Sequence, residues 1–157
     1  SLTMRGRTHA QLLGGSATHF TFAARCLAYV HLVAAVGRDF STVFRRKLFH
    51  RNVDIDGLET LSGDTFRWEA RYNDDLSRRE TTYLALGVFE YFRPRIPEAA
   101  RGASVVFLAN IDPSLQELVL SQLKKPRIVA VDTIDHWIST KKKLTAFNIN
   151  LQKKEKA

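Results

Sequence analysis

The chain has almost no cysteine and no apolar stretch long enough to cross a membrane. Cys26 is the single cysteine, which excludes an internal disulfide and fits a reducing, cytoplasmic setting. Because Cys26 falls in an apolar helical pattern, we expect a buried, inert thiol rather than a nucleophile. The most apolar run, residues 17–36, is interrupted by His19, Arg25 and His31, so the sequence predicts no membrane partner. The N-terminus also lacks the charged, apolar, small-residue order of a signal peptide.

The common sequence signatures of catalysis are also missing. The chain contains no phosphate-binding P-loop, no dinucleotide fingerprint and no locally supported Ser/His/Asp set. Its five histidines lack the spacing of metal ligands. From the residues themselves we therefore expect no metal site and name no catalytic residue.

Positive charge is concentrated near one end of the chain. The formal net charge is +8, and residues 141–157 supply +5 of it through six lysines and one glutamate. We interpret this segment as a solvated tail, and weak non-specific attraction to polyanions is the alternative. Phe147 is the one aromatic residue among these lysines. A base-stacking surface is therefore not indicated, and we expect no specific nucleic-acid partner.

Strand and helix patterns alternate along most of the chain. Apolar spacing predicts helices over 17–28, over 40–48 with Asp39 as N-cap, and from Asp112-Pro113 onward. Short apolar runs predict buried strands over 30–36, 105–108 and 127–132. Strands that alternate with helices favour a parallel sheet covered on both faces.

One segment has a different pattern and predicts a β-hairpin. Residues 65–72 alternate strictly, with Phe66 and Trp68 on one face and Arg67 on the other. A turn cluster at 73–75 follows, and residues 79–86 can return as the partner strand. We expect this hairpin to stand off the main sheet.

These patterns, taken in order, resemble the PfkB (ribokinase-like) family of carbohydrate kinases. The resemblance covers about residues 7–138 and is closest to a bacterial subgroup of PfkB sugar kinases. The segments that carry it are Leu13-Gly14-Gly15-Ser16-Ala17-Thr18, Val36-Gly37-Arg38-Asp39-Phe40, Asn52-Val53-Asp54-Ile55-Asp56-Gly57-Leu58, Thr65-Phe66-Arg67-Trp68, Asp75-Leu76-Ser77-Arg78-Arg79-Glu80-Thr81, Phe107-Leu108-Ala109-Asn110-Ile111-Asp112-Pro113 and Ala130-Val131-Asp132-Thr133.

The resemblance implies ATP-dependent phosphorylation of a sugar or nucleoside hydroxyl, with ATP and magnesium as cofactors of the full-length family. Two departures bear on that activity. The chain starts after the family's first β-strand, which supplies a substrate-binding aspartate. After Ile138 it lacks the acidic Asn-x-x-Glu motif, the nucleotide-binding half and the catalytic Gly-x-Gly-Asp turn. We therefore expect a truncated form that keeps the sugar-binding side, is inactive alone and needs no cofactor of its own.

Five residues on the main body are candidates for substrate binding. Gly14 and Gly15 would let the backbone approach a sugar closely, or they are a plain helix entry with Ser16 as N-cap. The Asn110 amide can bond sugar hydroxyls at the carboxyl end of a strand, or it is a turn residue. The resemblance places Asp132 near the phosphate or metal side, and a helix-capping aspartate is the alternative.

Arg67 is the sixth candidate, on the hairpin. It belongs to a group of hairpin arginines that would contact an anionic or phosphorylated sugar if the hairpin is a lid. The alternative is a solvated strand face paired with Glu69, Asp74 and Asp75. We expect Phe66 and Trp68 to pack the hairpin onto the body or onto a second subunit, and stacking of Trp68 on a sugar is the alternative.

The sequence therefore predicts an α/β fold, a Rossmann-like three-layer sheet of ribokinase type, truncated, with a β-hairpin lid. Residues 1–138 form the partial domain, with the hairpin at about 65–86, and residues 139–157 form a divergent lysine-rich tail. The expected partner is a weakly bound sugar or nucleoside. The alternative is a non-catalytic dimerisation or interaction module that uses the hairpin face. Lids of this family often dimerise, so the partner in that case is a second copy of the chain, bound through the hairpin. We also expect exposed apolar patches.

Overall fold

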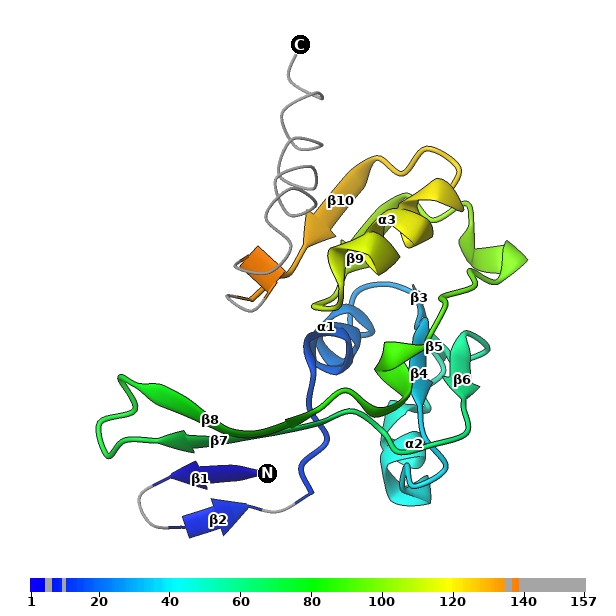
Figure 1. Ribbon diagram of the computed structural model, residues 1–157. Helices are drawn as coiled ribbons and strands as arrows, with labels where there is room; N and C mark the ends of the chain where they lie inside the picture. Colours follow the sequence, from blue (N-terminus) through cyan, green and yellow to red (C-terminus); the bar gives the residue numbers. More distant parts are fainter. Residues whose placement is uncertain (5–6, 10, 135–136, 139–157) are drawn as a thin grey trace.

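A computed structural model of the protein describes residues 1–4, 7–9, 11–134 and 137–138 (Figure 1). The expected lysine-rich tail at 139–157 lies outside the described residues. The elements are β1 (Leu2–Met4), β2 (Arg7–His9), α1 (Ser16–Ala24), β3 (Val30–His31), β4 (Ala34–Val36), α2 (Thr42–Leu48), β5 (Val53–Asp54), β6 (Leu58–Thr60), β7 (Arg67–Tyr72), β8 (Arg79–Ala85), η1 (Gly87–Glu90), η2 (Glu98–Ala100), β9 (Val105–Leu108), α3 (Pro113–Ser121) and β10 (Ile128–Val131).

Parallel strand pairs form the body, as the alternating pattern predicts. β3 pairs with β5, β4 with β6, and β9 with β10, all in parallel. Instead of one continuous three-layer sheet, the described strands of the body form these three short pairs. The strand expected over 30–36 is interrupted between β3 and β4. At this point the backbone of Gly57, in the turn between β5 and β6, approaches closely. A Cβ on Gly57 would lie 2.9 Å from the Leu32 backbone oxygen, which cannot rotate away, so this approach requires glycine.

Two apolar clusters hold the body together on opposite sides of β4. The first contains Leu32, Val36, Leu48, Val53 and Leu58, packed against residues of α1 and α2. The second contains Ala35, Val88 and Phe92, so the η1 segment covers the other face. Because Ala35 and Val36 are neighbours on one strand and point to opposite faces, this strand is buried on both sides, as its apolar sequence predicts.

Capping side chains account for two of the helix starts. α3 begins as predicted: Asp112 is its N-cap and accepts a hydrogen bond from the Ser114 nitrogen at 2.9 Å. The prediction of Asp39 as N-cap of α2 is wrong. Ser41 takes that place and accepts from the Val43 nitrogen, because the Asp39 carboxylate is bound to residues far along the chain.

The region after α1 also differs from the prediction. α1 ends at Ala24 rather than at residue 28, and the next residues make tighter turn bonds, such as that from the Cys26 nitrogen to the Ala23 oxygen. This turn lets the chain enter β3. Cys26 therefore lies beyond the helix and is exposed, so the expectation of a buried thiol is wrong.

A four-stranded sheet of order β2-β1-β7-β8, here called the hairpin sheet, extends to one side of the body (Figure 1). The expected β-hairpin is present as the antiparallel pair β7 and β8, with a register shift between Glu69 and Ala70. Trp68 pairs with Leu84, and Leu2 of β1 pairs with Ala70, so one face of the sheet collects apolar side chains. Phe66 packs the base of the hairpin onto the body, because its ring stacks on Phe89 with 5.1 Å between centroids.

Large apolar side chains are exposed at several places on the described surface, while the expected continuous apolar patches stay a prediction. Val105 and Ile128 pair at the start of β9 and β10 and are 56% and 51% exposed. Leu27 and Phe49 are 92% and 73% exposed near the ends of α1 and α2. In the described part of the chain, no helix has the length and apolar character to cross a membrane.

Candidate functional site

The start of α1 is joined to the chain just after β9. The Asn110 backbone nitrogen donates a hydrogen bond to Ser16 Oγ at 2.9 Å, across 94 residues of sequence. Nearby, the Phe20 ring of α1 stacks on Phe107 of β9 with 4.3 Å between centroids. The structure thus brings two predicted site residues together, and it gives Ser16 a role in tertiary structure instead of the N-cap role.

Gly15 is the residue that caps α1. Its φ of 92° lies in the left-handed region that favours glycine, and no side chain caps the helix. A Cβ on Gly14 or Gly15 would meet nothing within 4 Å. Open space therefore adjoins the first turn of α1, where backbone N–H groups have no intrahelical partners and the helix dipole is positive.

Gln116 ties together the carboxyl ends of β9 and β10. It is 2% exposed, and its Nε2 donates to the Ala109 oxygen at 2.9 Å and to the Asp132 oxygen at 3.1 Å. We call Ser16, Asn110, Gln116 and Asp132 the carboxyl-end cluster. Sequence reasoning missed Gln116, although a glutamine one turn after the capped start of α3, on the side of buried Pro113, was a usable signal.

Asp132 immediately follows β10, whereas the sequence predicts it as the last residue of that strand, and its backbone nitrogen donates to the Leu108 oxygen at 2.9 Å. The next residue carries an unusual atom. Among the described residues, Thr133 Oγ1 is the buried side-chain oxygen that lacks a hydrogen-bond partner. A buried hydroxyl in this state costs free energy unless water or a ligand supplies the missing bond.

The Asn110 side chain is held by a residue that sequence reasoning did not select. Trp137 Nε1 donates to Asn110 Oδ1 at 3.0 Å, and both residues are half-buried. Trp137 lies in helical backbone after β10, and its backbone nitrogen donates to the Ile134 oxygen at 3.0 Å. The amide of Asn110 is therefore oriented by the protein rather than free to rotate.

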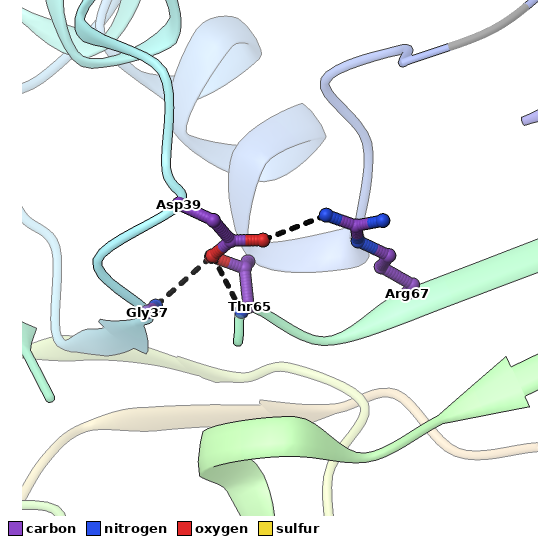
Figure 2. A network of polar contacts seen from close by, with 4 residues as sticks. All are labelled: Gly37, Asp39, Thr65 and Arg67. Atoms are coloured by element: carbon purple, nitrogen blue, oxygen red, sulfur yellow. Dashed lines mark hydrogen bonds and ion pairs between the residues drawn. The ribbon is translucent and has the colours of Figure 1, made fainter. Parts of the chain in front are cut away.

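Arg67 lies in a separate network at the base of the hairpin, shown in Figure 2. Asp39 Oδ1 accepts from the nitrogen and the hydroxyl of Thr65, both at 2.7 Å, and Asp39 Oδ2 accepts from Arg67 Nη2 at 2.8 Å. Thr65 Oγ1 also accepts from the Gly37 nitrogen at 2.9 Å. We call Gly37, Asp39, Thr65 and Arg67 the hairpin junction.

The junction favours the charged form of Asp39. The Thr65 hydrogen bonds, with the Arg67 bond and charge, lower the pKa of Asp39 to about 2, against a smaller opposing effect of burial. The Asp39 carboxylate in turn raises the pKa of Arg67. The partner of Arg67 is thus Asp39 on the body, which neither of the two sequence interpretations named.

Close backbone contacts complete the junction. A Cβ on Gly37 would overlap the Gly63 carbonyl and lie 2.5 Å from the Thr65 nitrogen. Gly87, at φ 54°, leaves no room for a Cβ beside the Asp64 carbonyl, whose oxygen accepts from the Val88 nitrogen at 2.9 Å. Both strands of the hairpin therefore leave the body through positions that require glycine.

The described residues do not make a magnesium site. Within the described ranges, no group of three or more His, Cys, Asp or Glu side chains could hold a metal ion. Asp132 is instead the carboxylate of a cluster otherwise built from amides and hydroxyls. Such groups suit the hydroxyls of a polar organic ligand better than Mg²⁺, which prefers several carboxylate or phosphate oxygens.

Comparison with known proteins gives a likeness in structure. No family model matches the chain, and no curated protein sequence does so either. Among solved structures, the crystal structure of a nucleoside kinase from Methanocaldococcus jannaschii, described as an archaeal member of the ribokinase family, matches with a TM-score of 0.57 and 14% identity. The match covers 83% of this chain and 48% of that one, so the chain spans about half the length of that kinase. The mixed α/β fold of this protein is thus similar to that of a ribokinase-family structure.

Proposed function

We propose that the protein binds a sugar or nucleoside at the carboxyl ends of β9 and β10, as the acceptor-binding part of a ribokinase-like kinase fold. The observation that carries this proposal is the hydrogen bond from the Asn110 nitrogen to Ser16 Oγ. It joins the start of α1, which no side chain caps, to the chain just after β9. Open α/β sheets bind their ligands at the carboxyl ends of their strands.

The chemistry of the carboxyl-end cluster suits a ligand rich in hydroxyl groups. A hydroxyl both donates and accepts hydrogen bonds. The Asp132 carboxylate would accept from such a group, while the Asn110 amide and the first N–H groups of α1 would donate to it. Thr133 Oγ1, which is buried and without a partner among the described residues, adds a further polar atom beside Asp132.

Phosphoryl transfer does not form part of the proposal for this chain by itself. The family resemblance assigns proton removal to an aspartate in a Gly-x-Gly-Asp turn, and the sequence contains no such turn. Loss of a general base typically slows a reaction by about 10²–10⁴-fold. The described residues also give Mg²⁺ no cluster of ligands. We therefore propose binding of the acceptor without turnover of ATP.

The test is thermal unfolding against a panel of sugars and nucleosides, each with and without Mg-ATP. A ligand that binds only the folded state raises the midpoint of unfolding in a concentration-dependent way. We expect a shift with at least one sugar or nucleoside and none with Mg-ATP alone. A shift with Mg-ATP alone would show that a nucleotide site exists, and no shift with any compound would contradict the proposal.

A pair of aspartate variants makes this test specific to the site. Asp132→Asn removes the carboxylate charge of the carboxyl-end cluster and should abolish or greatly reduce the shift. Asp56→Asn removes the same charge from an exposed turn of the body and should leave the shift unchanged. Equal loss in both variants would mean that the ligand responds to net charge rather than to the cluster.

A further inference from the structure

The orientation of the Asn110 amide is determined by Trp137. An indole N–H can only donate a hydrogen bond, so the atom of Asn110 that faces Trp137 Nε1 at 3.0 Å must be the oxygen Oδ1. The backbone nitrogen of Asn110 is already bound to Ser16 Oγ. These two bonds fix both the backbone and the side chain of Asn110.

The other end of the amide remains available. Within the described part of the chain, no hydrogen bond engages Asn110 Nδ2, and the buried side-chain atom without a partner is Thr133 Oγ1. Nδ2 is therefore reachable by solvent. The amide consequently offers N–H donors to a ligand, while its oxygen is held by the indole.

We propose that Trp137 is a specificity-determining residue of this site, because it makes Asn110 a donor toward the ligand. This inference rests on the proposed function and adds the chemical class that the site selects. The group that meets Asn110 must accept a hydrogen bond, as a hydroxyl, ring or carbonyl oxygen does. A protonated amino group at the same place, which can only donate, would face the N–H groups of Asn110 and be rejected.

Intrinsic fluorescence tests the first step without any ligand. The chain has two tryptophans, Trp68 and Trp137, so Trp68→Phe leaves Trp137 as the sole emitter. In that background, Asn110→Asp keeps an acceptor for the indole N–H, and Asn110→Leu removes it. We expect the wavelength of maximum emission of Trp137 to shift in the Leu variant and to stay unchanged in the Asp variant. Identical emission from all three proteins would overturn the orienting contact.

Ligand selection tests the second step, with the sugar or nucleoside that stabilises the unmodified protein as probe. Asn110→Asp, which replaces the donor end of the amide by an acceptor, should weaken binding at least about tenfold. Trp137→Phe should also weaken binding. A second probe, in which an amino group replaces one hydroxyl of the first, measures selectivity: the ratio of the two affinities should be smaller in Trp137→Phe than in the unmodified protein. Both affinities are read from thermal shifts at a pH where the amine is protonated.

The two proposals fail in different ways. If the unmodified protein binds no probe, the proposed function is wrong, and so is the proposed selection of ligands by Asn110. The fluorescence comparison would still decide whether Trp137 bonds to Asn110. If the unmodified protein binds a probe and Trp137→Phe keeps the same affinity and the same preference, the proposed function stands and the role of Trp137 is wrong.

Discussion

The hairpin junction and the carboxyl-end cluster are both polar, and they differ in whether their polar groups are satisfied. At the junction, both oxygens of Asp39 are bound, by Thr65 and by Arg67, and the backbone segments are packed against glycines. At the carboxyl-end cluster, Gly14 and Gly15 adjoin open space and Thr133 Oγ1 is buried without a partner among the described residues.

This difference indicates which of the two polar regions stabilises the fold and which is available to bind a ligand. A network that satisfies itself gains little from a ligand, because binding would first have to break its bonds. Unsatisfied groups beside open space gain from a ligand that supplies the missing bonds. The junction is therefore a structural joint between the hairpin sheet and the body, and the carboxyl-end cluster is the better candidate for binding. Arg67, predicted as a substrate ligand, belongs to the joint.

Gly37→Ala should have the largest effect of the changes considered. Its Cβ would lie 2.5 Å from the Thr65 nitrogen and closer still to the Gly63 carbonyl, which are backbone atoms that cannot rotate away. We expect the free energy of unfolding to fall by about 3 kcal/mol or more, or the protein to be recovered unfolded. Urea denaturation followed by circular dichroism measures this change.

Gly102→Ala is the matched control for that substitution. A Cβ on Gly102 would meet nothing within 4 Å, so the free energy of unfolding should change by less than about 1 kcal/mol. If the two alanine variants are equally stable, the backbone segments at the junction are not packed as closely as the structure shows.

Gln116→Leu should have the next largest effect. Leucine fills similar space but leaves the Ala109 and Asp132 carbonyl oxygens without their buried donor. We expect a loss of about 2 kcal/mol in the free energy of unfolding, together with loss or marked reduction of any ligand-induced thermal shift, because the backbone at Asp132 loses one of the hydrogen bonds that fix its position.

Gln122→Leu controls for stability alone. Gln122 also bonds through its side chain, donating to the Pro94 oxygen at 3.0 Å and accepting from the Ile96 nitrogen at 3.0 Å, at the other end of α3. It should destabilise the protein by a similar amount and leave the ligand shift intact. Should Gln122→Leu abolish the ligand shift as well, the shift reports general stability and gives no support to a site near Gln116.

Local patterns in the sequence predicted the helices and strands better than they predicted the contacts between those elements. The hairpin and the Asp112-capped helix α3 were predictable, because alternation and capping are properties of neighbouring residues. The role of Asp39 was not, since Thr65 lies 26 residues away and a serine nearer α2 satisfies the cap. Asp39-Phe40 has the local pattern of an ordinary helix start, because the bond between Asp39 and Thr65 joins residues far apart in the sequence.

The candidate site divides in the same way. Asn110 and Asp132 were predictable, because each follows a short apolar strand and such positions meet at one edge of a parallel sheet. Trp137 was not, because nothing in its local pattern links it to a residue 27 positions earlier. Cys26 was misplaced since its apolar pattern continues past Ala24, where the helix ends to allow the turn into β3.

Asp39→Asn should have a smaller effect at neutral pH, about 1–2 kcal/mol, because the carboxylate is partly solvated. The folded-state pKa of Asp39 is about 2, below its ordinary value of 3.8. The charged form therefore stabilises the protein above the ordinary pKa, and this contribution is lost as the pH falls through about 2.

The pH dependence distinguishes the junction bond from a simple change of side chain. The difference in unfolding free energy between the unmodified protein and Asp39→Asn should narrow as the pH falls from neutral to about 2. Acid-range urea denaturation of both proteins measures it. A difference that stays constant over this range would mean that Asp39 does not titrate with the lowered pKa that the junction implies.

Trp68→Ala should have the smallest effect on stability. It tests the proposal that two copies of the chain form a homodimer through the hairpin sheet. Trp68 lies on the apolar face of the sheet, with the Arg79 guanidinium 5.2 Å from its ring centroid and its Nε1 donating to Thr81 Oγ1 at 3.2 Å. It is thus held by its own sheet rather than by the body, and its ring can contribute to an interface.

Sedimentation across a range of protein concentrations decides the question. If the hairpin sheet pairs with a second copy, Trp68→Ala should weaken the dimer about tenfold or more, since buried aromatic side chains dominate such interfaces. Arg71→Ala, on the opposite face of β7, should leave it unchanged. A protein that stays monomeric at every concentration excludes the dimer. Dissociation by Arg71→Ala would instead place the interface on the polar face, opposite to the side where the apolar residues gather.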